Sequence, residues 1–173
     1  MDEKNAELLR GRSRAAFDAQ AATYDEGMEG DHARRLYQHV IGEVARAAAG
    51  MPAPRVLDLG CGTGALAERL PFHDAAFDVV VCNDSFHHYP DPERAAFQAW
   101  RVLAAGSALV LGDVWQPASA RALMNAWMPR SREGDVRIYS EAELRDVLGT
   151  WFSRVSWRRV GVTACVAVAR KDA

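Results

Sequence analysis

One aspartate and three glycines follow a short apolar segment, in the order Asp58, Gly60, Gly62 and Gly64. Glycine carries no Cβ, so the backbone can turn tightly here and its N–H groups can point toward a bound ligand. The aspartate lies at the carboxyl end of the predicted strand, which is the edge where open α/β sheets bind ligands. The pattern therefore predicts a loop that holds a nucleotide-like cofactor.

A second group of polar side chains follows the next apolar run, in the order Asn83, Asp84, His87 and His88. An imidazole can act as a general base when it reaches a proton of the substrate. His87 is the first candidate for this role and His88 the second. The alternative is that both histidines pack or hydrogen-bond within the loop. Asp113 ends a later apolar run, and we expect it in a solvated turn.

The stretch D-L-G-C-G-T-G from Asp58 to Gly64 resembles motif I of the class I S-adenosylmethionine-dependent methyltransferases. Residues 17–25 resemble the F-x-x-x-A-x-x-Y-D segment near the amino terminus of small-molecule methyltransferases. Residues 87–92 resemble the family's H-H-x-x-D-P segment. The chain is similar to the type 11 and ubiquinone/menaquinone-biosynthesis methyltransferases from about residue 17 to residue 170.

The resemblance implies S-adenosylmethionine as the cofactor and a small molecule as the methyl acceptor, with neither the acceptor nor the methylated atom identified. Alignment of acceptor and methyl group supplies most of the catalysis in such a displacement. The motif I loop would wrap the methionine part of the cofactor, and the amino-terminal segment would lie over it. The implied cofactor-binding residues are Tyr24, Asp58, Gly60, Cys61, Gly62, Thr63, Gly64, Asn83 and Asp84, and the candidate catalytic residues are His87 and His88.

The resemblance is interrupted between Leu70 and Pro71. In the family, motif I is followed by a strand whose last acid binds the ribose hydroxyls, a helix, and a strand with an acid near the adenine. Here residues 65–70 lead directly to residues 71–78, which resemble the segment before the family's strand four. We expect that Leu70 and Pro71 flank an omitted segment, and a natural deletion is the alternative. Without that segment, cofactor affinity should fall by orders of magnitude.

Two other functions remain open. A methyltransferase-like chain that lost its cofactor could serve as a binding module, which the missing adenosine half-site favours. A nicotinamide-dependent oxidoreductase is less favoured, although residues 60–65 also fit G-x-G-x-x-A and Asp84 ends the next strand. Asp58 argues against a dinucleotide, because its carboxylate would lie beside the pyrophosphate.

Alternating predicted strands and helices indicate one α/β domain with a mostly parallel sheet. The resemblance implies a Rossmann-like, three-layer methyltransferase sandwich that lacks strands two and three and ends in an antiparallel hairpin. Its sheet order would be 1-4-5-7-6 in the family's numbering, with the first strand as an exposed edge. We expect a helical lid over residues 1–50 and an α/β core over residues 51–173.

Short residue patterns predict where several of these helices begin. Asp91 followed by Pro92 predicts a helix start, and that helix should continue to Gly106. Ser140 and Glu143 form a predicted capping box. The expected strands are residues 56–59, 77–83, 108–111, 154–160 and 163–170, and the expected helices include residues 5–20, 31–50 and 117–127.

The composition is that of an ordinary globular chain of 173 residues, with 49% hydrophobic and 25% charged residues and a net charge of −2. Basic residues are scattered, so no nucleic-acid partner is expected. No apolar run reaches membrane-spanning length and the first residues are charged, so we expect a cytoplasmic protein with no membrane partner. The sequence leaves the oligomeric state open.

Cys61, Cys82 and Cys165 lack metal-ligand spacing, and we expect no metal site.

Overall fold

The computed structural model describes residues 3–22, 31–59, 70–131 and 134–173. Within these ranges the chain forms a sheet of five strands in the order β1-β2-β3-β5-β4. β1, β2 and β3 are parallel, whereas β5 runs antiparallel to both β3 and β4. This is the predicted order with its terminal hairpin. The strands are Val56–Asp58 (β1), Phe77–Asn83 (β2), Leu103–Val114 (β3), Arg154–Val160 (β4) and Ala164–Arg170 (β5).

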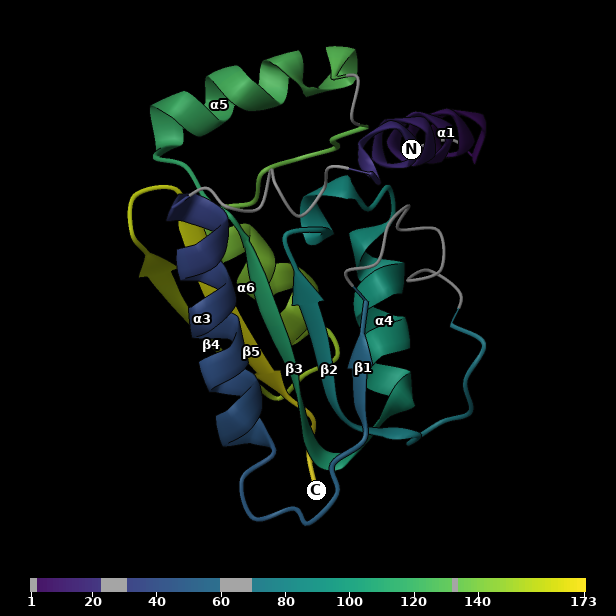
Figure 1. Cartoon of the computed structure of the whole chain (residues 1–173), viewed down its shortest axis with the longest axis vertical. Helices are drawn as coiled ribbons and strands as arrows, with labels where there is room; N and C mark the ends of the chain where they lie inside the picture. The colour runs from purple at the N-terminus through teal and green to yellow at the C-terminus, as the bar shows by residue number, and fades with distance from the viewer. Residues whose placement is uncertain (1–2, 23–30, 60–69, 132–133) are drawn as a thin grey trace.

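Helices cover both faces of this sheet, as the three-layer prediction requires. Helix α3 lies on one face, and α4 and α6 lie on the other (Figure 1). Helices α1 and α5 lie beyond the end of the sheet at which the parallel strands finish (Figure 1). The helices are Glu3–Gln20 (α1), Asp31–Ala47 (α3), Phe86–His88 (η1), Pro92–Val102 (α4), Ala118–Trp127 (α5), Met128–Arg130 (η2) and Glu141–Gly149 (α6).

Helix α3 packs closely on the middle of the sheet because Gly112 of β3 leaves room for it. Leu36 and Val40 lie one turn apart on α3 and are 1% and 2% exposed. A Cβ added at Gly112 would lie 2.4 Å from Cγ2 of Val40 and 3.1 Å from Cδ1 of Leu36. Glycine therefore sets how closely this helix approaches the strand that leads to Asp113.

The predicted helix starts are confirmed. The side chain of Asp91 accepts a hydrogen bond from the backbone N–H of Arg94, and Pro92 occupies the first turn of α4. Ser140 and Glu143 form a complete capping box at the start of α6. These caps supply partners for N–H groups that a helix leaves unpaired at its amino end.

The predicted end of α4 at Gly106 is wrong. The helix ends at Val102, and Leu103 already has extended backbone angles, with φ −75° and ψ 137°. Leu103 is fully buried and pairs with Phe77 of β2. Burial of Leu103 in the sheet therefore decides the boundary, which helix propensity alone would have placed later.

β1 is an edge strand of the sheet, as predicted. Within the described part of the chain it pairs with β2 alone, and its Val56 side chain is 44% exposed. Residues 60–69, which include most of the segment between motif I and Leu70, lie outside the described residues. No contact of the described residues tests whether a segment is omitted between Leu70 and Pro71, so that expectation stays a prediction. Among the helices that the structure describes, none combines the length and apolarity needed to cross a membrane.

Candidate functional site

The carboxyl ends of β1 and β2 lie side by side and are tied together by a polar cluster. The backbone N–H of Leu59 donates to the carbonyl of Val81 at 2.7 Å, which continues the parallel ladder past Asp58. The hydroxyl of Tyr89 donates to the carbonyl of Leu59 at 3.0 Å. Ser85 Oγ lies 3.2 Å from that hydroxyl and 3.1 Å from Cys82 Sγ. Leu59, which directly precedes the glycines of motif I, is thus hydrogen-bonded to the turn that carries the histidines.

The histidine turn is also anchored to β3. His87 lies in η1, and its Nδ1 atom is 2.5 Å from Oδ1 of Asp113. The backbone N–H of His87 donates to Oδ2 of the same carboxylate at 2.9 Å. Asp113 is 2% exposed. The expectation that Asp113 lies in a solvated turn is therefore wrong, because its carboxylate is buried and hydrogen-bonded to the neighbouring turn.

A second acid, Asp135, reaches the histidines from the loop that precedes α6. Its Oδ1 atom lies 3.4 Å from Nδ1 of His88 and 3.7 Å from Nε2 of His87. Its Oδ2 atom accepts a hydrogen bond of 2.5 Å from Ser131 Oγ. The backbone N–H groups of Val136 and Arg137 both donate to the carbonyl of His87, so backbone hydrogen bonds hold this loop against η1.

The two neighbouring imidazoles differ in charge. Burial alone would lower the pKa of His87, but the carboxylate of Asp113, with smaller contributions from Asp84 and Asp135, raises it to about 9. Burial and the nearby charge of His87 lower the pKa of His88 to about 4. The ring centroids lie 4.1 Å apart, so two charged rings would repel each other strongly. At neutral pH His87 is the protonated ring and His88 the neutral one.

Helix α1 covers this group of histidines and acids. The ring of Phe17 meets the ring of His88 edge to face, with centroids 5.6 Å apart. A Cβ added at Gly134 would lie 2.7 Å from the carbonyl oxygen of Leu9 and 2.9 Å from the backbone nitrogen of Ser13. The loop that carries Asp135 can therefore approach α1 this closely only with glycine at position 134.

Three predicted cofactor residues lie at the sheet edge that was expected. Asp58 ends β1 and is exposed, Asn83 ends β2, and Asp84 follows with φ +51°. The Oδ1 atom of Asn83 is buried and, within the described residues, makes no hydrogen bond. This oxygen lies beside Gly112, where α3 packs on the sheet, whereas the carboxylate of Asp58 is exposed. The other predicted positions, Tyr24, Gly60, Cys61, Gly62, Thr63 and Gly64, lie outside the described residues.

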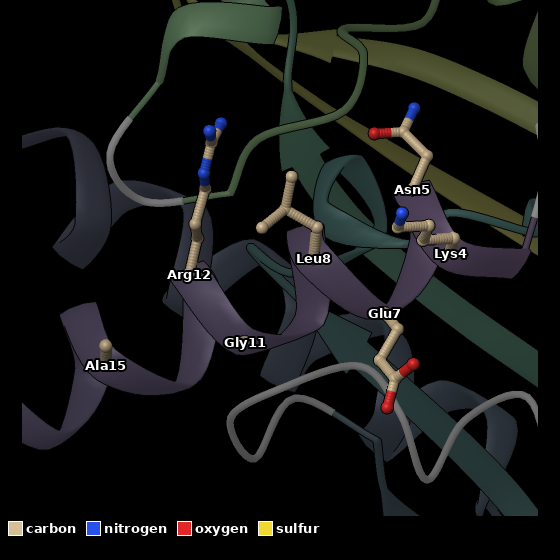
Figure 2. Close-up of a pocket in the computed structure, with 7 residues that line it drawn as sticks. All are labelled: Lys4, Asn5, Glu7, Leu8, Gly11, Arg12 and Ala15. Atoms are coloured by element: carbon tan, nitrogen blue, oxygen red, sulfur yellow. The ribbon is translucent and has the colours of Figure 1, made fainter.

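The described residues form two surface hollows, and both lie away from the histidines. One is lined by residues of α1 only, and Figure 2 shows their side chains spread along that helix. The other lies where the start of α4 meets α6 and includes Tyr139 and Glu143. Neither is lined by His87 or His88. Residues 60–69 lie outside the described part of the chain.

Sequence reasoning missed Asp135 altogether and underrated Asp113. Nothing in the spacing of the loop before α6 distinguishes Asp135 from a solvated acid. Asp113 did carry a usable signal, because it ends a buried strand at the same sheet edge as Asn83. The histidines themselves were correctly placed next to that edge.

Comparison with known protein families finds a match over residues 65–111 to the methyltransferase domain family. The demethylmenaquinone methyltransferase of Deinococcus radiodurans is 43% identical over 53 residues, which are 31% of this chain and 22% of that protein. The 27-O-demethylrifamycin SV methyltransferase of Amycolatopsis mediterranei is 51% identical over 47 residues, or 27% and 17% of the two chains. The chain thus spans about a fifth of the length of these curated relatives.

Solved structures share the fold over most of the chain. A SAM-dependent methyltransferase of Thermotoga maritima, described as a possible histamine N-methyltransferase, superposes with a TM-score of 0.64 and 16% identity. The superposition covers 92% of this chain and 100% of that one. The fold is therefore the Rossmann-like methyltransferase fold that the sequence predicted.

Proposed function

We propose that this chain, with its methyltransferase fold and family match, catalyses S-adenosylmethionine-dependent methyl transfer to a small-molecule acceptor. The observation that carries the proposal is the shared edge of β1 and β2, where Asp58 and Asn83 lie near the histidine turn. The named methyltransferases that resemble the chain act on small molecules, which supports an acceptor of that class.

The cofactor would be held at its methionine end by Asp58 and Asn83, together with Asp84 and the backbone of Gly60–Gly64. S-adenosylmethionine supplies an electrophilic methyl group on a sulfonium. The exposed carboxylate of Asp58 is an acceptor for an ammonium group. A hydrogen bond to a charged group contributes about 1.5–3 kcal/mol.

The histidines would face the acceptor. His88 is neutral at pH 7, since its pKa is lowered to about 4, and a neutral ring can accept a proton. His87 is held protonated by Asp113, so it can donate a hydrogen bond but cannot act as a base at neutral pH. We therefore assign proton acceptance to His88 in preference to His87, with His87 as a positioning residue.

Calorimetric titration with S-adenosylhomocysteine tests the proposal. Asp58→Ala should weaken binding about 10- to 100-fold, which corresponds to the loss of one charge-assisted hydrogen bond. Asp172→Ala is the matched control, because Asp172 is an exposed acid next to the carboxyl terminus, and that terminus lies at the opposite end of the sheet from the carboxyl end of β1 (Figure 1). Equal affinities for the two variants would refute the role of Asp58.

A second function, that of a binding module without cofactor, is favoured by the position of β1 at the edge of the sheet. Strands that would bind adenosine have no counterpart beside it in the described residues, so affinity for the cofactor should be low. A chain of verified length that binds S-adenosylhomocysteine in the low micromolar range would exclude this alternative. A chain that shows no binding at millimolar concentration would favour it.

We also propose that α1 and the residues after it form the lid of a single domain, which the packing of Phe17 and Gly134 supports. A cytoplasmic location is favoured by the buried free thiols of Cys82 and Cys165. Burial raises the pKa of both thiols to about 12, so they are not reactive thiolates.

A further inference from the structure

The histidine pair and Asp135 present three metal-binding atoms around one point. One ligand atom from each of His87, His88 and Asp135 lies within 4.8 Å of the other two. The two ring nitrogens nearest the carboxylate oxygen Oδ1 of Asp135 are Nε2 of His87 and Nδ1 of His88. The carboxylate oxygen is 3.7 Å from the first nitrogen and 3.4 Å from the second. Zinc bonds of 2.0–2.2 Å in a tetrahedron place neighbouring ligands about 3.3–3.6 Å apart. The 3.4 Å separation falls within this range, and the 3.7 Å separation lies just above it.

An independent observation concerns His88. Its side chain is 5% exposed, and within the described part of the chain its Nδ1 atom makes no hydrogen bond. The 3.4 Å separation from Asp135 therefore lacks the geometry of a hydrogen bond, although the two groups face each other. A buried polar atom without a partner costs about 1–3 kcal/mol, and a cation between these atoms would remove that cost.

The surrounding groups orient the ligands as they do in known metal sites. His87 directs its other nitrogen, Nδ1, to Asp113 at 2.5 Å, which leaves Nε2 toward Asp135. Metal-bound histidines almost always make such a hydrogen bond to a carboxylate, carbonyl or water. Asp135 in turn uses Oδ2 to accept from Ser131 and keeps Oδ1 toward the rings.

Asp113 itself is not a ligand in this arrangement. Its Oδ1 accepts from the His87 ring and from the backbone N–H of Val114, and its Oδ2 accepts from the backbone N–H of His87. Both oxygens are already engaged within the protein. This favours the group formed by His87, His88 and Asp135 over the alternative group of Asp84, His87 and Asp113.

We infer that His87, His88 and Asp135 form a site for a divalent transition metal, Zn²⁺ in the first instance, with a fourth coordination position open. Two imidazoles and one carboxylate are a donor set that zinc takes in proteins. Hard cations such as Mg²⁺ are disfavoured, because they prefer oxygen ligands. This inference replaces the expectation from sequence that the chain has no metal site.

Metal binding does not depend on methyl transfer. Only the use of the open position rests on the proposed function, since an oxygen or nitrogen of the acceptor could bind there. Without metal, His87 is protonated at neutral pH, so Zn²⁺ would have to displace the proton on its Nε2 atom, and metal binding should release that proton. The metal would also occupy the Nδ1 lone pair of His88, so a metal-loaded chain would orient the acceptor through the metal and not through that ring.

The test is calorimetric titration of the metal-free full chain with Zn²⁺ alone, with Co²⁺ as a spectroscopic probe. We expect one Zn²⁺ per chain and visible absorption bands of four-coordinate Co²⁺. Asp135→Asn and His88→Ala should each weaken binding by more than tenfold, since even the loss of an orienting partner costs 10–100-fold. The matched control is His73→Ala, because His73 is exposed and hydrogen-bonds only to the neighbouring carbonyl of Asp74 among its described contacts.

Circular dichroism would show whether the variants fold. If His88→Ala does not fold, Asp135→Asn still tests the inference. The inference is overturned if the wild-type chain binds no stoichiometric Zn²⁺, or if Asp135→Asn binds it as tightly as wild type. It is also overturned if His73→Ala weakens binding equally. The titration contains no cofactor, so its failure is distinguishable from a failure to bind S-adenosylhomocysteine.

Discussion

His87 and Asp113 are joined twice, once through the imidazole Nδ1 at 2.5 Å and once through the backbone N–H at 2.9 Å. One carboxylate therefore fixes both the ring and the main chain of the histidine turn. Because η1 directly follows β2 and Asp113 lies on β3, the pair also locks the relative position of these two strand ends.

Replacing Asp113 with Asn tests this pair. The amide keeps the shape but removes the charge, so the pKa of His87 should fall from about 9 to near or below its ordinary value of 6.5. Loss of a hydrogen bond to a charged group should lower the free energy of unfolding by about 1.5–3 kcal/mol. NMR titration of the His87 ring measures the first effect, and a pKa that stays near 9 would contradict it.

The same pair predicts how stability depends on pH. The pKa of His87 is raised in the folded chain, so its stabilising contribution is complete below about pH 6.5 and is lost as the pH rises through about 9. Chemical denaturation of the wild type at pH 6, 7.5 and 9 should show this loss. In Asp113→Asn the free energy of unfolding should decline much less between pH 6 and pH 9.

Gly134→Ala should loosen α1. Gly134 has φ +75°, and a Cβ there would meet backbone atoms of α1 at 2.7 and 2.9 Å. Gly161→Ala is the matched control, because Gly161 has φ +57° and open space around it. The control carries only the backbone cost, roughly 1–2 kcal/mol, and Gly134→Ala should cost more. Hydrogen exchange should show faster exchange of α1 amides in Gly134→Ala alone, and equal rates in both variants would refute the contact.

Gly112→Ala should displace α3 from the sheet. The added methyl would lie 2.4 Å from Val40 and 2.9 Å from Oδ1 of Asn83, neither of which can move far in a packed core. Overpacking of this kind costs about 1–3 kcal/mol. Gly149→Ala, at the end of α6 with nothing within 4 Å, should be neutral or stabilising. Thermal unfolding compares the two, and a stable Gly112→Ala chain would show that α3 can move without cost.

The capping box of α6 should govern stability in acid. Burial opposes the charge of Glu143, but hydrogen bonds from Ser140 and the Arg137 guanidinium lower its pKa to about 2. This contribution is present above the ordinary pKa of 4.5 and is lost as the pH falls toward 2. Ser140→Ala should cost about 1 kcal/mol at pH 7. The control is Ser156→Ala, because Ser156 is an exposed residue of β4 that takes no part in the capping box. The acid-unfolding midpoint of Ser140→Ala should lie at a higher pH than that of the control, and equal midpoints would exclude the role of the cap.

Much of this fold could be predicted because its signals are local. Asp91 with Pro92, and Ser140 with Glu143, specify helix starts through hydrogen bonds within four residues of sequence. The continuous apolar run before Asn83 predicted a buried strand because both of its faces are covered by helices. The end of α4 could not be predicted in this way, since the burial of Leu103 depends on its pairing with Phe77.

The residues of the candidate site also differ in how far they could be predicted from local sequence. His87, His88 and Asn83 could be located from sequence because they follow a strand end directly. Asp135 could not, because the path of its loop is set by contacts with distant elements. Those contacts include the hydrogen bonds from Val136 and Arg137 to His87 and the packing of Gly134 on α1.

The hydroxyl of Tyr89 bridges the last described carbonyl of the β1 edge, that of Leu59, and the turn that carries the histidines. A displacement at one of these two places is therefore transmitted mechanically to the other. Under the proposed function, substitutions in the loop around Asp135 can change which molecule fits beside the histidines without breaking the hydrogen bond from Tyr89 to Leu59. On the same proposal, the acceptor side of the site could thus change while Tyr89 preserves the spacing to the β1 edge.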